Sequence, residues 1–326
     1  MSPLGLFILL LQGAYLVHSF TNLCPPVEDL QPCYCVSDGK AIRVDCMQVT
    51  SVEEVRTALQ SVKGIKRVFI DFLRARLDKI PSDLFKGLHV TKLSFTNCEL
   101  KAFGDEGRSA LEGLEDIIEE LSIHFSFSEE NELKYLNVSQ LRALEDLEIE
   151  GNGLTKMGNE FFKDGPENVK NLYIMTNFIE ELGDKAFASL YNLKNLWLTG
   201  NRFKTVHRSM FPTPALYLAS LDLTNNQIST LPEDMFSRMP ALKEVVLAEN
   251  SIQRLAEATW LPVWRQITRL YLEKNPLECD SHIDWMLKIP RPYVLKGKCV
   301  TPEKRKDKDL KRLIDDSLLD RSDEGF

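Results

Sequence analysis

One apolar pattern recurs six times between Leu144 and Leu277, and it constrains the fold of this chain more than any other feature. In the first copy, apolar residues stand at offsets 0, 3 and 5 from Leu144, an asparagine at offset 8 and a leucine at offset 10. The copies begin at Leu144, Val169, Leu193, Leu218, Leu242 and Ile267, which are 24 or 25 residues apart. Offsets 3 and 5 alternate as in a β-strand, so the side chains between them face the other way. Such short repeats are expected to stack into a solenoid.

The length of this period and the order of its residues are those of a leucine-rich repeat, so the chain resembles that superfamily. The resemblance implies an α/β solenoid, a horseshoe with a parallel concave β-sheet and an irregular, short-helical convex side. Three less regular copies come first, at Ile65, Val68 and Ile70, at Val90, Leu93 and Phe95, and at Ile118, Leu121 and Ile123, with Leu73, Cys98 and Ser126 in the asparagine position. We therefore predict about nine repeats over residues 65–277.

Two further apolar columns follow the strands and predict the interior of the solenoid. Offset 13 holds Met157, Leu182, Val206, Leu231 and Leu255, and offset 18 holds Phe162, Phe187, Phe211, Phe236 and Trp260. An aromatic column at this spacing is interpreted as core rather than as a cofactor site. The amide of each asparagine both donates and accepts hydrogen bonds, so it is expected to satisfy turn backbone that would otherwise be buried unpaired.

Four of the seven cysteines, Cys24, Cys33, Cys35 and Cys46, lie close together near the N-terminus. Their spacing alone allows three pairings, and a zinc site built on the C-x-C core is the alternative. The cluster resembles the N-terminal cap of extracellular leucine-rich repeat proteins. This resemblance implies the disulfides Cys24–Cys35 and Cys33–Cys46.

The C-terminal segment resembles the C-terminal cap of the same family but departs from it. Ser281 stands where that cap has a second cysteine, and no fourth cysteine follows, so the resemblance leaves one disulfide, Cys279–Cys299. Trp285, Met286 and Leu287 would cover the final strand, and Leu310, Leu313, Ile314 and Leu318 form one helical stripe. Cys98 is left over and is interpreted as a buried free thiol.

We divide the chain into a signal peptide (1–19), a disulfide-bonded N-terminal cap (20–64), the repeats (65–277), a C-terminal cap (278–319) and a disordered tail (320–326). Residues 1–19 hold no charged side chain and include an apolar run from Leu4 to Leu11, which is typical of a cleaved signal. The alternative, a membrane anchor, needs about 20 apolar residues. The expected location is therefore secreted and extracellular.

Composition and motifs exclude several functional classes. A formal net charge of −8 argues against nucleic-acid binding, which needs a basic surface. The usual catalytic and nucleotide-binding motifs are absent, so we expect no enzymatic activity and no cofactor. His89, His124, His207 and His282 lack ligand spacing and are interpreted as surface residues rather than metal ligands.

The outward positions of the predicted strands form the candidate partner-binding surface. Tyr173, Trp197, Asp222 and Tyr271 occupy the central position of their strands, and Met175 lies beside Tyr173. Exposed aromatic residues in a row are costly unless a partner covers them, and Tyr and Trp are common interface anchors. Asp146, Glu148 and Glu150 alternate on one strand and form an acidic patch with Glu119 and Glu120, which is either solvated surface or a binding site for a basic partner.

These features indicate a secreted recognition protein that binds a protein or glycan partner on its concave face. An N-glycosylation sequon at Asn137 lies on the returning side of the third repeat, where a glycan would leave that face free. The opening cysteine pattern is also similar to that of secreted arthropod repeat proteins of the luciferase non-catalytic-subunit kind. That resemblance implies an alternative, a stabilising accessory subunit of a secreted enzyme complex such as a luciferase-type oxygenase. An immune pattern-recognition or matrix role is a third possibility.

Overall fold

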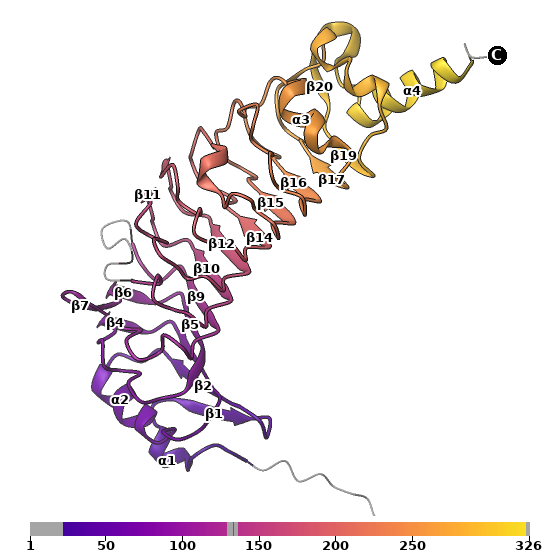
Figure 1. Ribbon diagram of the computed structural model, residues 1–326. Coiled ribbons are helices and arrows are strands. Elements are labelled where there is room, and N and C mark those ends of the chain that lie inside the picture. The colour runs from indigo at the N-terminus through magenta and orange to yellow at the C-terminus, as the bar shows by residue number, and fades with distance from the viewer. Residues whose placement is uncertain (1–21, 129–132, 134–135, 324–326) are drawn as a thin grey trace, which may run out of the picture.

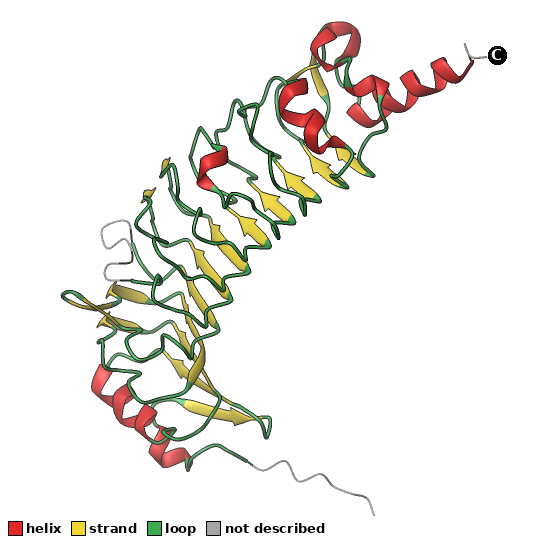
Figure 2. Cartoon of the chain, viewed as in Figure 1, coloured by secondary structure: helices red, strands yellow, loops and turns green. Residues whose placement is uncertain are grey.

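A curved sheet of 12 strands runs the length of the computed structural model, along the inner side of an arc (Figures 1 and 2). The structure describes residues 22–128, 133 and 136–323, with side chains as far as residue 317. The signal peptide expected at 1–19 lies outside the described residues. The strand order is β1-β2-β3-β5-β9-β10-β12-β14-β15-β16-β17-β19, and every neighbouring pair is parallel except β1 and β2.

The repeats supply the middle of this sheet with one strand each. Because β1, β2 and β19 belong to the caps, the other nine strands match the predicted number of repeats. These strands are β3 (Val68–Leu73), β5 (Val90–Thr96), β9 (Glu120–His124), β10 (Asp146–Glu150), β12 (Asn171–Met175), β14 (Asn195–Trp197), β15 (Ser220–Asp222), β16 (Glu244–Val246) and β17 (Arg269–Tyr271). The predicted fold class, a horseshoe with a parallel concave sheet, is confirmed.

The convex side consists mostly of loops, with short strands and helical turns. These elements are β4 (Arg76–Lys79), β6 (Glu99–Ala102), β7 (Gly104–Asp105), β8 (Arg108–Ser109), β11 (Lys156–Met157), β13 (Glu181–Leu182), β18 (Leu277–Glu278), β20 (Cys299–Thr301), the 3₁₀ turn η1 (Arg208–Met210) and α3 (Glu257–Trp264). The expected aromatic column is buried, and its rings meet along the solenoid at centroid distances of 6.1 Å for Phe162–Phe187 and 6.2 Å for Phe187–Phe211. Each fully enclosed leucine contributes about 1.5–3 kcal/mol to this continuous core.

The asparagine ladder behaves as its chemistry predicts. Asn250 donates through Nδ2 to the carbonyl oxygens of Leu223, Leu247 and Ala248, and its Oδ1 accepts from the Ile228 amide at 3.0 Å. In the third repeat, the buried Ser126 takes the asparagine's place and binds across the repeats through its hydroxyl to the Cys98 amide at 3.1 Å. Each ladder residue thereby joins two turns that would otherwise bury unpaired backbone groups.

The structure corrects the frame of the first repeat. The sequence pattern predicts Leu73 in the asparagine position, but Leu73 is half-buried at the concave end of β3. Ile70 pairs with Leu93 and Phe72 with Phe95, so Ala75 takes the place that Cys98 has in the next repeat. The prediction was wrong because a register shift between Val68 and Phe69 moves the frame, and apolar spacing alone does not reveal such a bulge.

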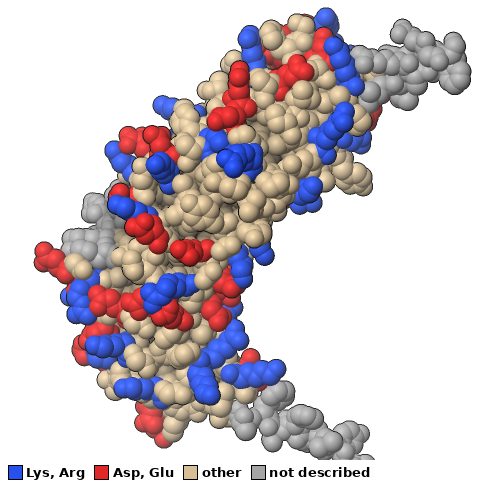
Figure 3. Space-filling model, viewed as in Figure 1, with Lys and Arg blue, Asp and Glu red and all other residues tan. Residues whose placement is uncertain are grey.

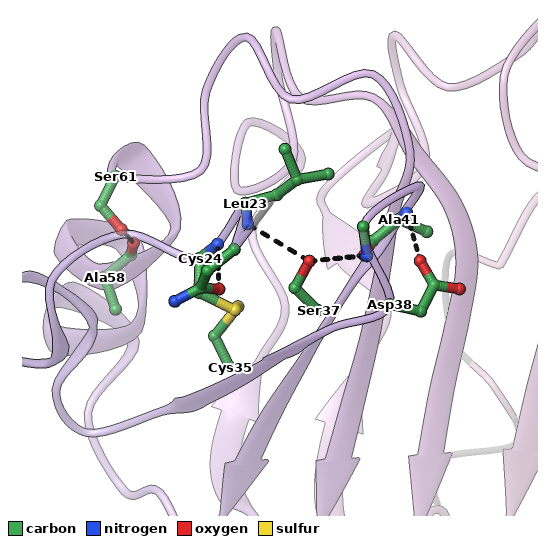
Figure 4. The surroundings of a disulfide bond; sticks show 10 residues. Leu23, Cys24, Cys35, Ser37, Asp38, Ala41, Ala58 and Ser61 are labelled. Atoms are coloured by element: carbon green, nitrogen blue, oxygen red, sulfur yellow. Dashed lines mark hydrogen bonds between the residues drawn. A yellow bond between two sulfur atoms is a disulfide. The ribbon is translucent and has the colours of Figure 1, made fainter. Parts of the chain in front are cut away.

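Two disulfides hold the N-terminal cap, which contains α1 (Val27–Leu30), β1 (Tyr34–Ser37), β2 (Ile42–Met47) and α2 (Val52–Gln60). They are Cys24–Cys35 and Cys33–Cys46, the pairs that the family resemblance implies. Beside the first disulfide, Ser37 Oγ accepts a hydrogen bond from the Leu23 amide at 3.2 Å (Figure 4). The β1–β2 hairpin turns through Asp38, whose carboxylate accepts from the Ala41 amide at 2.7 Å.

The C-terminal cap adds one strand to the sheet and then closes it. It contains η2 (Ser281–Ile283), η3 (Met286–Lys288), β19 (Val294–Lys296), η4 (Glu303–Arg305) and α4 (Leu310–Asp323), and it carries the expected disulfide Cys279–Cys299. Trp285 covers the last repeat, since its ring meets that of Trp264 edge to face at 4.9 Å and its Nε1 donates to the Leu255 carbonyl. In α4, Leu310 and Ile314 are buried. The helix extends to Asp323, past the boundary expected at 319.

Candidate recognition surface

Strand register places the outward side chains of the concave face in rows that cross the repeats. The central row runs through Ser122, Glu148, Tyr173, Trp197, Asp222, Val246, Tyr271 and Lys296, each paired with the next across neighbouring strands. The buried positions alternate with these along β9, β10 and β12. All eight predicted partner-binding residues therefore lie on the concave face.

Tyr173 and Trp197 form one aromatic pair at the centre of this face. Their rings meet edge to face with centroids 4.8 Å apart. The side chain of Trp197 is 39% exposed, whereas Tyr173 and the neighbouring Met175 are half-buried. Burial, with Asp146 and Glu148 nearby, raises the pKa of Tyr173, so its phenol stays neutral and remains a hydrogen-bond donor. We call Tyr173, Met175 and Trp197 the aromatic patch.

Tyr271 stands apart from the aromatic patch. In the central row, Asp222 and Val246 lie between Trp197 and Tyr271. The strands that carry these two aromatic residues, β14 and β17, are therefore three strand spacings, or about 14 Å, apart. Asp222 is partly engaged, because its Oδ1 accepts from the Thr224 amide at 2.8 Å. The expected row of aromatic residues is thus one contacting pair and one separate tyrosine.

The row beside the central one is a ladder of polar side chains. Asn171 donates through Nδ2 to Asp146 Oδ1, and its own Oδ1 accepts from Asn195 at 2.6 Å. Further along, Glu244 accepts from Ser220 at 3.1 Å and forms an ion pair with Arg269 at 2.7 Å. Asp146 is therefore held by a neighbouring amide rather than standing free for a partner.

Basic residues neutralise much of the predicted acidic patch. Glu120 pairs with Lys92 at 2.5 Å, and Glu119 pairs with Arg67 at 3.4 Å. In the side view of Figure 3, acidic and basic residues are interspersed over the N-terminal half of the molecule. Glu148 and Glu150, which lie one strand further along, are the part of the patch that faces a histidine instead.

The structure brings His124 to these two glutamates, which the sequence interpretation missed. His124 ends β9 and pairs in register with Glu150 of β10, and its side chain is 23% exposed. Its Nε2 lies 3.2 Å from Glu148 Oε2 but is not directed at any hydrogen-bond partner. Contact with Glu148 raises the pKa of His124, and burial of the ring opposes this rise. Aligning the third and fourth repeats in the sequence would have placed His124 beside Glu150.

Within the described part of the chain, His124, Glu148 and Glu150 are the one group of three or more potential metal ligands. One ligand atom from each lies within 4.8 Å of the others.

Cys98 is a buried free thiol, as the sequence predicts. Burial raises its pKa, which disfavours the reactive thiolate.

Comparison with known proteins identifies the repeats of the C-terminal half of the sheet. The profile described as "Leucine rich repeat" matches residues 142–203, 167–216 and 217–277, and these ranges cover the strands from β10 to β17. Residues 142–277 therefore consist of leucine-rich repeats.

Some similar proteins match this chain over most of their length, and others match it over only a part. It is 25% identical over 309 residues to the Oplophorus-luciferin 2-monooxygenase non-catalytic subunit of Oplophorus gracilirostris, covering 84% of this chain and 82% of that protein. It is 27% identical to mouse podocan, covering 68% of this chain and 34% of that protein. It is also 27% identical to mouse Toll-like receptor 9, of which it spans 17%.

Solved structures agree on the fold. A chain of the octameric complex of latrophilin 3, Unc5D and FLRT2 (LRR) superposes with a TM-score of 0.57 at 17% identity, over 87% of this chain and 96% of that one. The TLR13–ssRNA13 complex superposes with a TM-score of 0.57 at 19% identity, over 71% of this chain and 35% of that chain. Over the described residues, the structure holds no helix that is both long and apolar enough to cross a membrane.

Proposed function

We propose that this protein is an extracellular, non-enzymatic recognition protein that binds a protein or glycan partner on its concave face. The observation that carries the proposal is the aromatic patch. A tryptophan that stands 39% exposed on a regular sheet, backed by a tyrosine, leaves apolar area in water that a partner would cover. Tryptophan and tyrosine are also the residues that most often dominate binding energy at interfaces.

The extracellular part of the proposal rests on the disulfides. Three disulfides with one unpaired, buried thiol are the pattern of a protein that folds in an oxidising compartment.

Asn137 is exposed, and its Oδ1 accepts hydrogen bonds from the amide and hydroxyl of Ser139, the third residue of its sequon. Removal of N-glycans from the native protein should raise its electrophoretic mobility, and Asn137→Gln should abolish the shift. An unshifted native protein would contradict glycosylation at this site.

Capture experiments with matched variants test the binding face. The mature chain, Trp197→Ala and Tyr191→Ala are immobilised and exposed to the native secretion, and bound proteins are quantified by mass spectrometry. Tyr191 is 58% exposed in the loop before β14, so its variant removes a similar exposed aromatic outside the concave face. The proposal expects one partner to be retained by wild type and Tyr191→Ala and lost by Trp197→Ala. Equal capture by all three would contradict it.

The second candidate function is that of a non-catalytic accessory subunit of a secreted enzyme complex. It is favoured by the similarity to the Oplophorus luciferase non-catalytic subunit, which extends over 84% of this chain and 82% of that protein. In that case, the captured partner is a catalytic chain, and addition of this protein should lengthen that chain's half-life on warming. A partner without enzymatic activity, such as a receptor ectodomain or a glycan, favours recognition alone.

A further inference from the structure

The concave face carries a histidine and two glutamates whose arrangement suits a metal ion. His124 comes from the end of β9, and Glu148 and Glu150 come from alternate positions of β10, so all three point to the same side of the sheet. Their ligand atoms lie within 4.8 Å of one another. Each residue is half-buried, and the backbone of two adjacent strands holds its position.

The geometry of His124 and Glu148 fits two ligands of one ion better than it fits a hydrogen bond. Nε2 is buried and is not directed at an acceptor, although Glu148 Oε2 is only 3.2 Å away. Zn²⁺ binds imidazole nitrogen and carboxylate oxygen at about 2.0–2.2 Å in a tetrahedral shell, which sets neighbouring ligands about 3.3–3.6 Å apart. The third ligand atom, from Glu150, lies within 4.8 Å of the other two.

The chemistry of the donors selects the class of metal. Ca²⁺ and Mg²⁺ are bound by oxygen alone and need six or more ligands, whereas one imidazole with two carboxylates suits Zn²⁺ and similar divalent transition metals. We propose that His124, Glu148 and Glu150 bind one Zn²⁺ ion on the concave face. Three protein ligands leave at least one coordination position for water or for a group brought by another molecule.

Neighbouring side chains support this assignment. Thr176 donates through Oγ1 to Glu150 Oε1 at 3.4 Å, which orients that carboxylate from the next strand. No lysine or arginine ion pair is formed by Glu148 or Glu150 among the described residues, whereas the neighbouring Glu119 and Glu120 both have one. The two carboxylates of this patch that no lysine or arginine neutralises are therefore those of Glu148 and Glu150, which face the His124 imidazole. The site does not depend on the proposed partner-binding function, because its three ligands come from this chain.

Calorimetric titration of ZnCl₂ into the untagged, metal-free mature protein at pH 7.5 tests the site. Wild type should bind one Zn²⁺ per chain, and His124→Gln and Glu148→Gln should each weaken the affinity at least about tenfold. His89→Gln is the matched control, since His89 is exposed and belongs to another part of the surface, and it should bind like wild type. CaCl₂ and MgCl₂ should give no saturable heat.

A spectroscopic readout separates ligation from loss of fold. Co²⁺ added to wild type should give visible absorption bands of a nitrogen- and oxygen-ligated ion, and Glu148→Gln should lose them while keeping the wild-type circular dichroism. Glu148→Gln preserves the size of the side chain, so it remains informative if His124→Gln fails to fold. Absence of Zn²⁺ binding by wild type, wild-type affinity in Glu148→Gln, or equal binding of Ca²⁺ would each overturn the proposal.

Discussion

The ring of Trp197 packs edge to face on the ring of Tyr173, with a centroid separation of 4.8 Å across strands β12 and β14. Such aromatic pairs contribute about 0.5–1.5 kcal/mol beyond the area they bury. A double-mutant cycle of Tyr173→Ala and Trp197→Ala, measured by urea unfolding, should give a coupling of that size. A coupling near zero would show that the two rings are independent and that Trp197 has no fixed orientation for a partner.

The ladder asparagines should be the most sensitive polar positions of the solenoid. Asn250 is buried and satisfies four backbone groups in two neighbouring repeats, so Asn250→Ala leaves an amide and several carbonyls unpaired. We expect a loss of about 3 kcal/mol in the free energy of unfolding. Ser251→Ala alters the exposed neighbour and should change it by less than about 0.5 kcal/mol. Similar losses in both variants would mean that side-chain hydrogen bonds do not hold the turn.

The period of the sequence predicts the strands and core from β10 onward because every copy buries the same offsets. Leu147, Leu172 and Leu196 are fully enclosed in successive strands. The first repeat shows where this reasoning fails, since one register shift moved the ladder position from Leu73 to Ala75. Offset 13 is likewise less uniform than expected, because Leu182 and Leu231 are only half-buried at the convex surface.

The concave face is harder to predict from sequence because it depends on lateral neighbours. His124 and Glu150 both stand at offset 6 of their repeats, so the repeat frame aligns them, but it does not show that the His124 ring turns toward Glu148. Neutralisation of Glu119 and Glu120 likewise depends on Arg67 and Lys92, which come from loops and strands that the acidic run does not reveal. The sequence shows which side chains follow one another along a strand, but these ion pairs and contacts form between neighbouring strands.

Cys98 should be unreactive until the protein unfolds. Its side chain is 5% exposed, and burial raises the pKa of the thiol, so little thiolate reaches solvent. Ellman's reagent should detect no thiol in the native mature protein and one thiol per chain in denaturant, because the other six cysteines are paired. Cys98→Ser should show none in either condition. A thiol that reacts at once in the native protein would contradict its burial.

Asp105 should give the protein an acid-dependent part of its stability. Its carboxylate accepts hydrogen bonds from Lys79 and from the amide and hydroxyl of Ser82, at 3.0 Å and 2.9 Å for the latter two, which ties β7 to the preceding convex loop. The hydrogen bond from Lys79, followed by those from Ser82, holds the pKa of Asp105 well below its ordinary value. A carboxyl whose pKa is depressed in the folded state stabilises the fold above its unfolded pKa of about 3.9. That stability is lost as the pH falls below this value and the carboxylate is protonated.

Asp105→Asn should therefore unfold at lower urea concentration than wild type at pH 7, and the difference should shrink as the pH is lowered from 5 to 2. Glu106→Gln makes the same change of charge at the next, exposed residue, and its midpoint should follow wild type over the whole range. A difference between Asp105→Asn and wild type that stays constant down to pH 2 would show that the amide loses packing or geometry rather than charge. The contribution would then belong to the loop contact and not to the ionised carboxylate.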